Sequence, residues 1–288
     1  MRFNDEGVAL QRAALVEFAR GRRKLITALE RIDEEVLSAL PEVQVVSKFG
    51  VGTDMIDMQA MIRHGVRLGW TGGVNKRSVT ELTVAFMISL LHLVPLASGE
   101  VREGAWRNRQ GRQLSGRVVG IIGCGHIGKD LATILRTFGC RVLAHDIRSY
   151  SEFYAAHQIE PAGLEELLSR ADIATLHVPL DDSTRGMLSA GRLALLRPGA
   201  LLINTARGGL VDEPVLKAML MDGRLAGAAF DVFSTEPPED LELLRLPNFL
   251  ATPHIGGSTQ EAILAMGRAA ISGLDVNMVP SADHPDMG

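Results

Sequence analysis

The stretch Gly123-Cys124-Gly125-His126-Ile127-Gly128 decides the fold because of the segments that flank it. It follows the apolar run 118–122 and opens a helical pattern that ends at Phe138-Gly139. A second apolar run, 142–144, then leads to Asp146. Strand, glycine turn, helix, strand and acid in this order are typical of a dinucleotide-binding βαβ unit. The glycines let the backbone approach a pyrophosphate, and the positive end of the helix dipole attracts that anion.

The position of Asp146 strengthens this interpretation. It lies 18 residues beyond Gly128, at the end of the second predicted strand. A carboxylate at that place can accept hydrogen bonds from both hydroxyls of a ribose. We therefore predict a dinucleotide site built from the glycine turn and Asp146.

Composition bounds the class of protein. The chain has 288 residues, of which 46% are hydrophobic, enough for one large or two ordinary domains. The net charge is −4, and the densest basic stretch, 20–24, is short, so we expect no nucleic-acid partner. The N-terminus lacks the apolar core of a signal peptide, and the most apolar run, Leu82–Leu96, is too short to span a bilayer. We expect that run to form a buried helix, and we expect no membrane partner.

The chain contains two cysteines, Cys124 and Cys140. They are too few for a disulfide framework and lack the spacing of metal ligands, so we expect no metal site. A reducing, cytoplasmic location fits this composition. Cys124 lies inside the glycine turn, which favours a small tolerated side chain over redox chemistry.

Regular alternation of strands and helices from Val118 onward predicts a parallel, doubly wound sheet with right-handed crossovers. We expect strands near 118–122, 141–145, 173–177, 200–204, 226–231 and 249–251, and helices near 127–138, 163–169, 213–222 and 259–272. A smaller α/β unit precedes it. There we expect helices at 1–22, 34–40 and 57–64 and strands at 25–28, 43–46 and 66–68. A long apolar helix at 80–92 is expected to connect this unit to the larger one.

Polar residues follow several of the predicted strands, at the edge where an open α/β sheet binds its ligands. They are His177, Arg207, Asp231, Glu236 and His254. Hydride transfer to a carbonyl leaves an alkoxide that must be protonated, and a histidine suits that task near neutral pH. A carboxylate can orient the imidazole, and an arginine can bind a carboxylate through two parallel N–H bonds.

Each of these residues also has a purely structural interpretation. His254 can be a histidine of the core, although it lies between Pro253 and Gly256-Gly257 in a predicted loop. Arg207 can pair with Asp231 or Asp212. A glutamate before two prolines, as Glu236 is, is ordinarily a solvated loop charge.

From about Val43 to Met266 the sequence resembles the D-isomer-specific 2-hydroxyacid dehydrogenases, in particular the phosphoglycerate-dehydrogenase-like branch. The motifs that carry the resemblance, in the family's order, are the substrate loop 48–57, the hinge-helix opening 75–81, the cofactor turn 123–128, the segment His177-Val178-Pro179-Leu180 with Thr184, the arginine segment 204–209, the glutamate segment 229–238 and the histidine segment 252–257.

The resemblance implies a role for each matching position. Arg207 binds the substrate carboxylate and keto oxygen, His254 is the general acid or base, and Glu236 holds His254 protonated for reduction. The backbone N–H groups of Val51 and Gly52 take the substrate carboxylate. The cofactor contacts implied by the family are Gly123, Gly125, Gly128, the N–H groups of His126 and Ile127, Asp146, His177, Pro179, Thr184, Ala206, Asp231 at the nicotinamide carboxamide, and Gly256.

The resemblance further implies an α/β protein with two domains. A Rossmann domain over 76–256 binds NAD, and a smaller flavodoxin-like substrate domain is formed by 1–75 and 257–288. Asp146 favours NAD over NADP because it repels a 2′-phosphate, whereas Arg148 keeps NADP open. The implied reaction interconverts a small D-2-hydroxy acid and its 2-keto acid. Alternatives are a non-catalytic NAD-binding regulator, or a dehydrogenase of an anion such as phosphite or formate.

The family also implies a homodimer, with the apolar region Glu81–Leu96 as the contact candidate. The sequence departs from the family at its N-terminus. Only 47 residues precede the substrate-loop motif, fewer than the family usually has. The first strand and helix of the substrate domain are therefore expected to be missing or replaced by Met1–Arg22.

Overall fold

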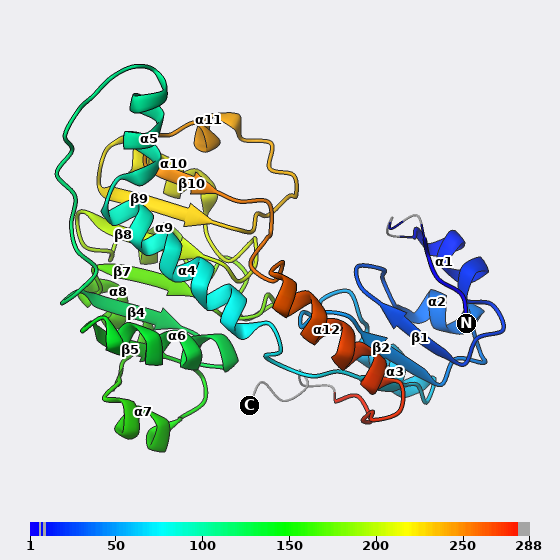
Figure 1. The fold of residues 1–288 in the computed structure, drawn as a ribbon. Helices are drawn as coiled ribbons and strands as arrows, with labels where there is room; N and C mark the ends of the chain where they lie inside the picture. Colours follow the sequence, from blue (N-terminus) through cyan, green and yellow to red (C-terminus); the bar gives the residue numbers. More distant parts are fainter. Residues whose placement is uncertain (6, 8–9, 282–288) are drawn as a thin grey trace. The chain divides into compact units, whose positions relative to one another are not determined.

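The computed structural model describes residues 1–5, 7 and 10–281. Within it the chain forms two compact units (Figure 1). The smaller unit consists of 1–75 and 257–288, and the larger one of 76–256. That the smaller unit takes the substrate stays a prediction.

The larger unit is built on a seven-stranded sheet, ordered β10-β9-β8-β7-β4-β5-β6, in which every pairing is parallel. Ile121 pairs with Ala144 on one side and with Thr175 on the other. Central strands of such a sheet are covered on both faces and so read as continuous apolar runs. The strands are β4 (Val118–Ile122), β5 (Arg141–His145), β6 (Glu160–Pro161), β7 (Ile173–Leu176), β8 (Ala200–Asn204), β9 (Leu225–Phe230) and β10 (Phe249–Ala251).

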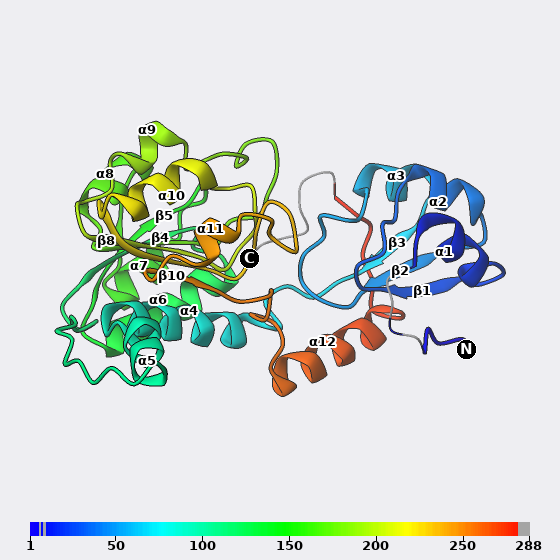
Figure 2. The same ribbon diagram turned by 90° about the horizontal axis from the view of Figure 1, so that it is seen from above.

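Helices cover both faces of this sheet, as Figure 2 shows. One core layer packs under α4 and α6, and the other packs under α8, α9 and α10. The helices are α4 (Lys76–Leu91), α5 (Val94–Arg102), α6 (His126–Thr137), α7 (Ser151–His157), α8 (Leu164–Arg170), α9 (Ala190–Leu193), α10 (Glu213–Met221) and α11 (Leu241–Leu244). The doubly wound parallel sheet expected from the sequence is confirmed.

The apolar run Leu82–Leu96 is not one helix, which corrects the sequence-based prediction. Leu93 adopts a left-handed backbone with φ of 56°, so α4 ends before it and α5 begins after it, with Pro95 in its first turn. The two helices are bent by 64°. Among the described residues no single helix is long and apolar enough to cross a membrane, and α4 and α5 reach that length and apolarity only when taken together.

The smaller unit contains a parallel sheet ordered β1-β2-β3. Its strands are β1 (Lys24–Thr27), β2 (Val45–Lys48) and β3 (Arg67–Gly69), and its helices are α1 (Arg12–Ala19), α2 (Glu34–Ala39), α3 (Met58–Arg63) and α12 (Gln260–Gly273). The helix expected over 1–22 is confined to α1, and residues 6, 8 and 9 lie outside the described part. The C-terminal α12 packs on β2 and β3, where Ser47 donates its hydroxyl to the carbonyl of Ala270 at 2.7 Å.

Local capping signals place the helix starts. Asp33, Asp57, Asp212 and Thr259 each accept a hydrogen bond from the N–H three residues on, at 2.9–3.2 Å. The elements β6, α7, α9 and α11 were not predicted.

Candidate active site

The candidate residues of the larger unit lie in loops at the carboxyl ends of its strands. The sheet runs from β4 through β5 to β6 on one side and from β7 to β10 on the other. The strand order therefore reverses between β4 and β7. Open α/β sheets bind their ligands at such a switch point, outside the carboxyl ends of the strands.

The glycine turn after β4 is shaped by backbone contacts that exclude side chains. Gly123 has φ of 95° and donates its N–H to the carbonyl of His145 at 2.8 Å. A Cβ at this position would lie 2.6 Å from the carbonyl oxygen of His177. A Cβ on Gly128 would overlap the carbonyl of Gly123, so α6 lies directly on the turn. The turn thus offers bare backbone and the N-terminal end of α6, the arrangement that a pyrophosphate requires.

Asp146 ties the end of β5 to this turn. Its Oδ2 accepts a hydrogen bond from the N–H of Cys124 at 2.6 Å, and its Oδ1 accepts one from the N–H of Arg148 at 2.9 Å. A carboxylate oxygen has a second lone pair, so each oxygen can still accept from a ribose hydroxyl. Burial raises the pKa of the Cys124 thiol to about 11, which keeps the sulfur protonated and unreactive.

The segment after β7 contributes a neutral histidine. The Nε2 atom of His177 lies 2.9 Å from the hydroxyl of Thr175, and burial lowers the pKa of the imidazole to about 3. Its Nδ1 atom is buried and has no hydrogen-bond partner in the described part of the chain. Thr184 donates its hydroxyl to the carbonyl of Pro179 at 2.7 Å and accepts the N–H of Asp181 at 2.9 Å. In this structure Thr184 therefore closes its own turn.

The loop after β8 is held by a residue that the sequence analysis did not assign to the site. Asn204 is 1% exposed, and its side-chain amide donates to the carbonyl of Arg207 at 2.8 Å and accepts the N–H of Ala206 at 3.1 Å. Arg207 donates from Nη1 to the carbonyl of Ala206 at 2.7 Å. Asparagine directly after a buried strand commonly bonds the backbone two residues on, and that signal could have identified Asn204.

Asp231, at the end of β9, holds the loop that carries His254. It is 2% exposed, and its Oδ1 accepts the hydroxyl of Thr252 at 2.5 Å and the N–H of Ile255 at 2.8 Å. Its Oδ2 accepts the N–H of Gly256 at 2.7 Å. The carboxylate thus accepts three hydrogen bonds from the 252–256 turn. The sequence did not indicate that Asp231 holds this turn. Its predicted contact with a nicotinamide carboxamide stays a prediction.

Glu236 and His254 are brought together from loops that are 18 residues apart in the sequence. The Nδ1 atom of His254 lies 3.0 Å from Oε2 of Glu236, and Oε1 of Glu236 accepts the N–H of Phe233 at 3.1 Å. His254 has a left-handed backbone with φ of 56°, a strained conformation for a non-glycine residue. The side chain of His254 is 52% exposed and that of Glu236 is 41% exposed, so neither is a core residue.

The loop of Arg207 lies against the loop of Glu236. A Cβ on Gly208 would overlap the carbonyl of Phe233 and the backbone nitrogen of Ser234. The N–H of Gly209 also donates to the hydroxyl of Ser234 at 3.1 Å. Backbones from three strand ends are therefore linked, and they carry a guanidinium, a carboxylate and an imidazole.

Comparison with known proteins decides the family. The model of the D-isomer specific 2-hydroxyacid dehydrogenase, NAD binding domain, matches residues 84–256, more than half of the chain. The chain belongs to this dehydrogenase family. The matched residues contain every cofactor position predicted in the larger unit, and NAD is the cofactor.

Relatives of this chain match it over most of its length. It is 35% identical to D-3-phosphoglycerate dehydrogenase of Sus scrofa over 240 residues, which are 83% of this chain and 45% of that protein. The chain thus spans about half the length of the curated relatives it matches. A glyoxylate reductase from Paecilomyes thermophila superposes with a TM-score of 0.87 at 25% identity, covering 96% of this chain and 89% of that one. A pyruvate reductase of Chlamydomonas reinhardtii superposes with a TM-score of 0.78 at 29% identity, covering 93% of this chain and 87% of that one.

The observed turn fits a dinucleotide. Gly123 and Gly128 stand where a Cβ would collide with backbone, α6 begins at the turn, and the Asp146 carboxylate borders it. No group of three or more histidine, cysteine, aspartate or glutamate side chains is arranged to hold a metal ion within 1–5, 7 and 10–281.

The segment 48–57, predicted to be the substrate loop, lies in the smaller unit and begins at the end of β2. Lys48 is 5% exposed and donates from Nζ to the carbonyls of Ala28 and Phe49, each at 2.7 Å. The indole N–H of Trp70 donates to the carbonyl of Val51 at 2.9 Å. These bonds shape the loop around Val51 and Gly52, whose predicted contacts with a substrate carboxylate stay a prediction.

Proposed function

We propose that this chain is an NAD-dependent dehydrogenase that interconverts a small D-2-hydroxy acid and its 2-keto acid. The observation that carries the proposal is the 3.0 Å contact between His254 Nδ1 and Glu236 Oε2; the loop of Glu236 in turn lies against the loop of Arg207. An imidazole fixed by a carboxylate, with an arginine in the adjoining loop, suits proton transfer to an anionic substrate.

His254 acts as the proton donor in reduction and as the acceptor in oxidation. Its Nδ1 atom faces Glu236, which leaves Nε2 as the nitrogen that exchanges a proton with the substrate oxygen. Glu236 orients the ring and is itself oriented by the N–H of Phe233. The three hydrogen bonds of Asp231 hold the turn on which His254 stands.

Arg207 recognises the acid. Its guanidinium can bind a carboxylate through two parallel N–H bonds and polarise the neighbouring carbonyl. The bonds of Asn204 to Ala206 and Arg207 position the start of that side chain. The N–H groups of Val51 and Gly52 are proposed as further donors to the substrate carboxylate.

When bound, NAD supplies or accepts the hydride at the substrate carbon. Gly123, Gly125 and Gly128 make room for the pyrophosphate, and the first N–H groups of α6, at His126 and Ile127, face it. Asp146 holds the ribose and disfavours a 2′-phosphate. Pro179, Ala206 and Gly256 are proposed to line the remainder of the cofactor site.

The test is a panel of acids assayed with NADH and with NAD. Glyoxylate, hydroxypyruvate, pyruvate and phosphohydroxypyruvate would be mixed with the chain and NADH, and the absorbance of the reduced cofactor followed. The proposal expects turnover of at least one acid. Tight NADH binding without turnover of any acid would favour a regulator, and oxidation of phosphite or formate by NAD would favour a different substrate class.

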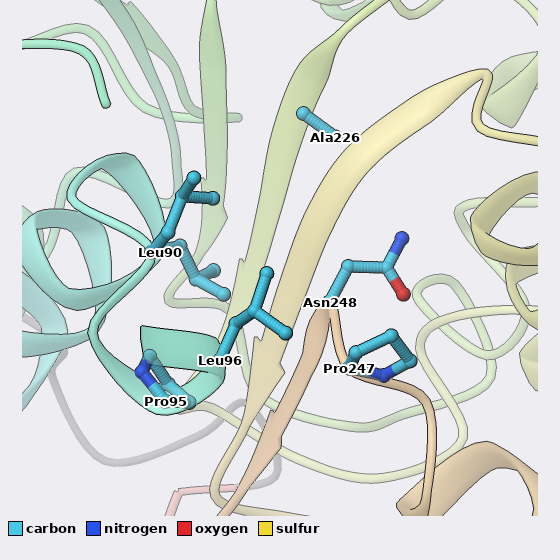
Figure 3. A pocket seen from close by; sticks show the side chains of 7 residues that line it. Leu90, Pro95, Leu96, Ala226, Pro247 and Asn248 are labelled. Carbon is cyan, nitrogen blue, oxygen red and sulfur yellow. The ribbon is translucent and has the colours of Figure 1, made fainter. Parts of the chain in front are cut away.

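We propose in addition that the chain forms a homodimer through α5 and the segment that follows it. Within the expected contact region Glu81–Leu96, Phe86, Met87 and Leu91 are buried in the core of their own unit, so the proposed contact uses other residues of that region together with α5. No residue of α5 is buried, and Trp106 beyond it is 91% exposed. Beside α5 lies an apolar groove (Figure 3), lined by Leu90, Leu93, Pro95, Leu96, Ala226, Pro247 and Asn248. Such a surface suits a second copy of the chain.

Sedimentation of the wild type, Trp106→Ala and Val101→Asp tests the dimer. The wild type is expected to sediment as a dimer and both variants as weaker dimers or monomers. A monomeric wild type at micromolar concentration would contradict this proposal without affecting the catalytic one. The predicted cytoplasmic location stays a prediction.

A further inference from the structure

The hydroxyl of Ser234 links two loops of the candidate site. It accepts the N–H of Gly209, two residues beyond Arg207, at 3.1 Å. It donates to Oε1 of Glu213, the first residue of α10, at 2.7 Å. The same carboxylate oxygen accepts the backbone N–H of Ser234 at 3.0 Å. One hydroxyl and one carboxylate therefore join the loop after β8, the loop after β9 and the start of α10.

This link is placed where packing is weak. Phe233 is buried in the core, but residues 234–237 are exposed. A cavity of about 150 Å³ borders the same segment and is lined by Glu213, Ser234 and Thr235, among others. Because the segment has little apolar contact beyond Phe233, hydrogen bonds must determine where it lies.

We propose that Ser234 and Glu213 are positioning residues that set Glu236, and through it His254, relative to Arg207. This inference rests on the proposed dehydrogenase function. Glu236 stands two residues beyond Ser234 and accepts the N–H of Phe233, so a shift of the segment moves the carboxylate directly. The bonds to Glu213 are made to an ionised group and are stronger than neutral ones.

Four variants separate the link from its surroundings. Ser234→Ala removes the hydroxyl, whereas Ser234→Thr keeps it. Glu213→Gln keeps an oxygen that accepts both bonds without the charge. Thr235→Ala is the matched control, because Thr235 is the adjacent exposed residue and its side chain has no hydrogen bond among the described residues.

The expected result is a loss of kcat without a loss of cofactor binding. Ser234→Ala should lower kcat by at least about tenfold, within the roughly hundredfold that a displacement of 1 Å can cause. The KM for NADH should stay unchanged, since the glycine turn is untouched. Ser234→Thr and Thr235→Ala should keep the kcat of the wild type. The kcat of Glu213→Gln should lie between that of the wild type and that of Ser234→Ala.

A double-mutant cycle with Glu236→Gln shows whether Ser234 acts through Glu236. In that background Ser234→Ala should cause little further loss of kcat, because the group it positions is already disabled. An unchanged kcat in Ser234→Ala, or an equal loss in both backgrounds, would overturn the inference. A wild type that turns over no acid overturns the proposed function, and the positioning role with it. That failure is recognised in the wild type alone.

Discussion

Replacing Asp231 by asparagine should separate the stability of the His254 turn from the chemistry of His254 itself. Asparagine has nearly the shape of aspartate but carries one acceptor oxygen and one donor nitrogen. If its oxygen takes the place of Oδ1, the bonds from Thr252 and Ile255 persist. Its amide nitrogen then faces the N–H of Gly256, which now lies 2.7 Å from Oδ2, so two donors oppose each other.

The magnitude follows from these contacts. A hydrogen bond to a charged group contributes about 1.5–3 kcal/mol, and Gly256 is buried, so its N–H finds no substitute in water. With the two remaining bonds weakened from charged to neutral, we expect the free energy of unfolding to fall by about 3 kcal/mol. For a domain of this size that corresponds to a Tm lowered by about 6–12 °C. If the amide nitrogen instead took the place of Oδ1, the bonds from Thr252 and Ile255 would both be lost, and only the bond from Gly256 would remain.

The assay combines thermal unfolding with steady-state kinetics. Thr252→Val is the graded control, since it removes only one donor and should cost about 1.5 kcal/mol, the lower end of the range for a hydrogen bond to a charged group. Below its own Tm, Asp231→Asn should show a lower kcat, because the left-handed conformation of His254 depends on the turn that Asp231 holds. An unchanged Tm together with an unchanged kcat would refute the reasoning, as would a larger loss in Thr252→Val than in Asp231→Asn.

The remaining predictions use single substitutions. His254→Ala should lower kcat by about 10² to 10⁴ with NADH binding nearly unchanged, measured by fluorescence titration; retained activity would remove His254 from the mechanism. Asp146→Ala should weaken NAD more than NADP, and equal losses would show that it does not recognise the ribose. His177 has its pKa lowered to about 3 by burial, so the unfolded state binds more protons between that value and about 6.5, and stability falls as the pH drops through this range. Between neutral and acid pH the free energy of unfolding of His177→Asn, measured with denaturant, should therefore fall less than that of the wild type. Parallel curves of unfolding free energy against pH would contradict this. Gly208→Ala should lower kcat, because its Cβ would push the Arg207 loop off Phe233; wild-type kinetics would show that the loops tolerate separation.

Strands and glycine turns were predictable because their signals are local. The buried strands of a parallel sheet are continuous apolar runs, so 118–122, 141–145, 200–204 and 249–251 agree with the observed bounds. Gly123 and Gly128 were predicted from their spacing together with the apolar runs that flank them, and each is a position where a Cβ would meet backbone. The helix over 82–96 was wrong, because apolar periodicity does not report the left-handed conformation of Leu93.

Among the site residues, the sequence by itself determined which chemical groups follow which strands, since each such group stands next to its own strand in the chain. Which of these groups touch was decided only by the tertiary structure. Asp231 lies against the 252–256 turn, Glu236 against His254, and Ser234 against Gly209 because adjacent parallel strands align their carboxyl ends. Hydrogen bonds across that edge depend on ångström distances between loops, and no pattern along a single chain records such distances.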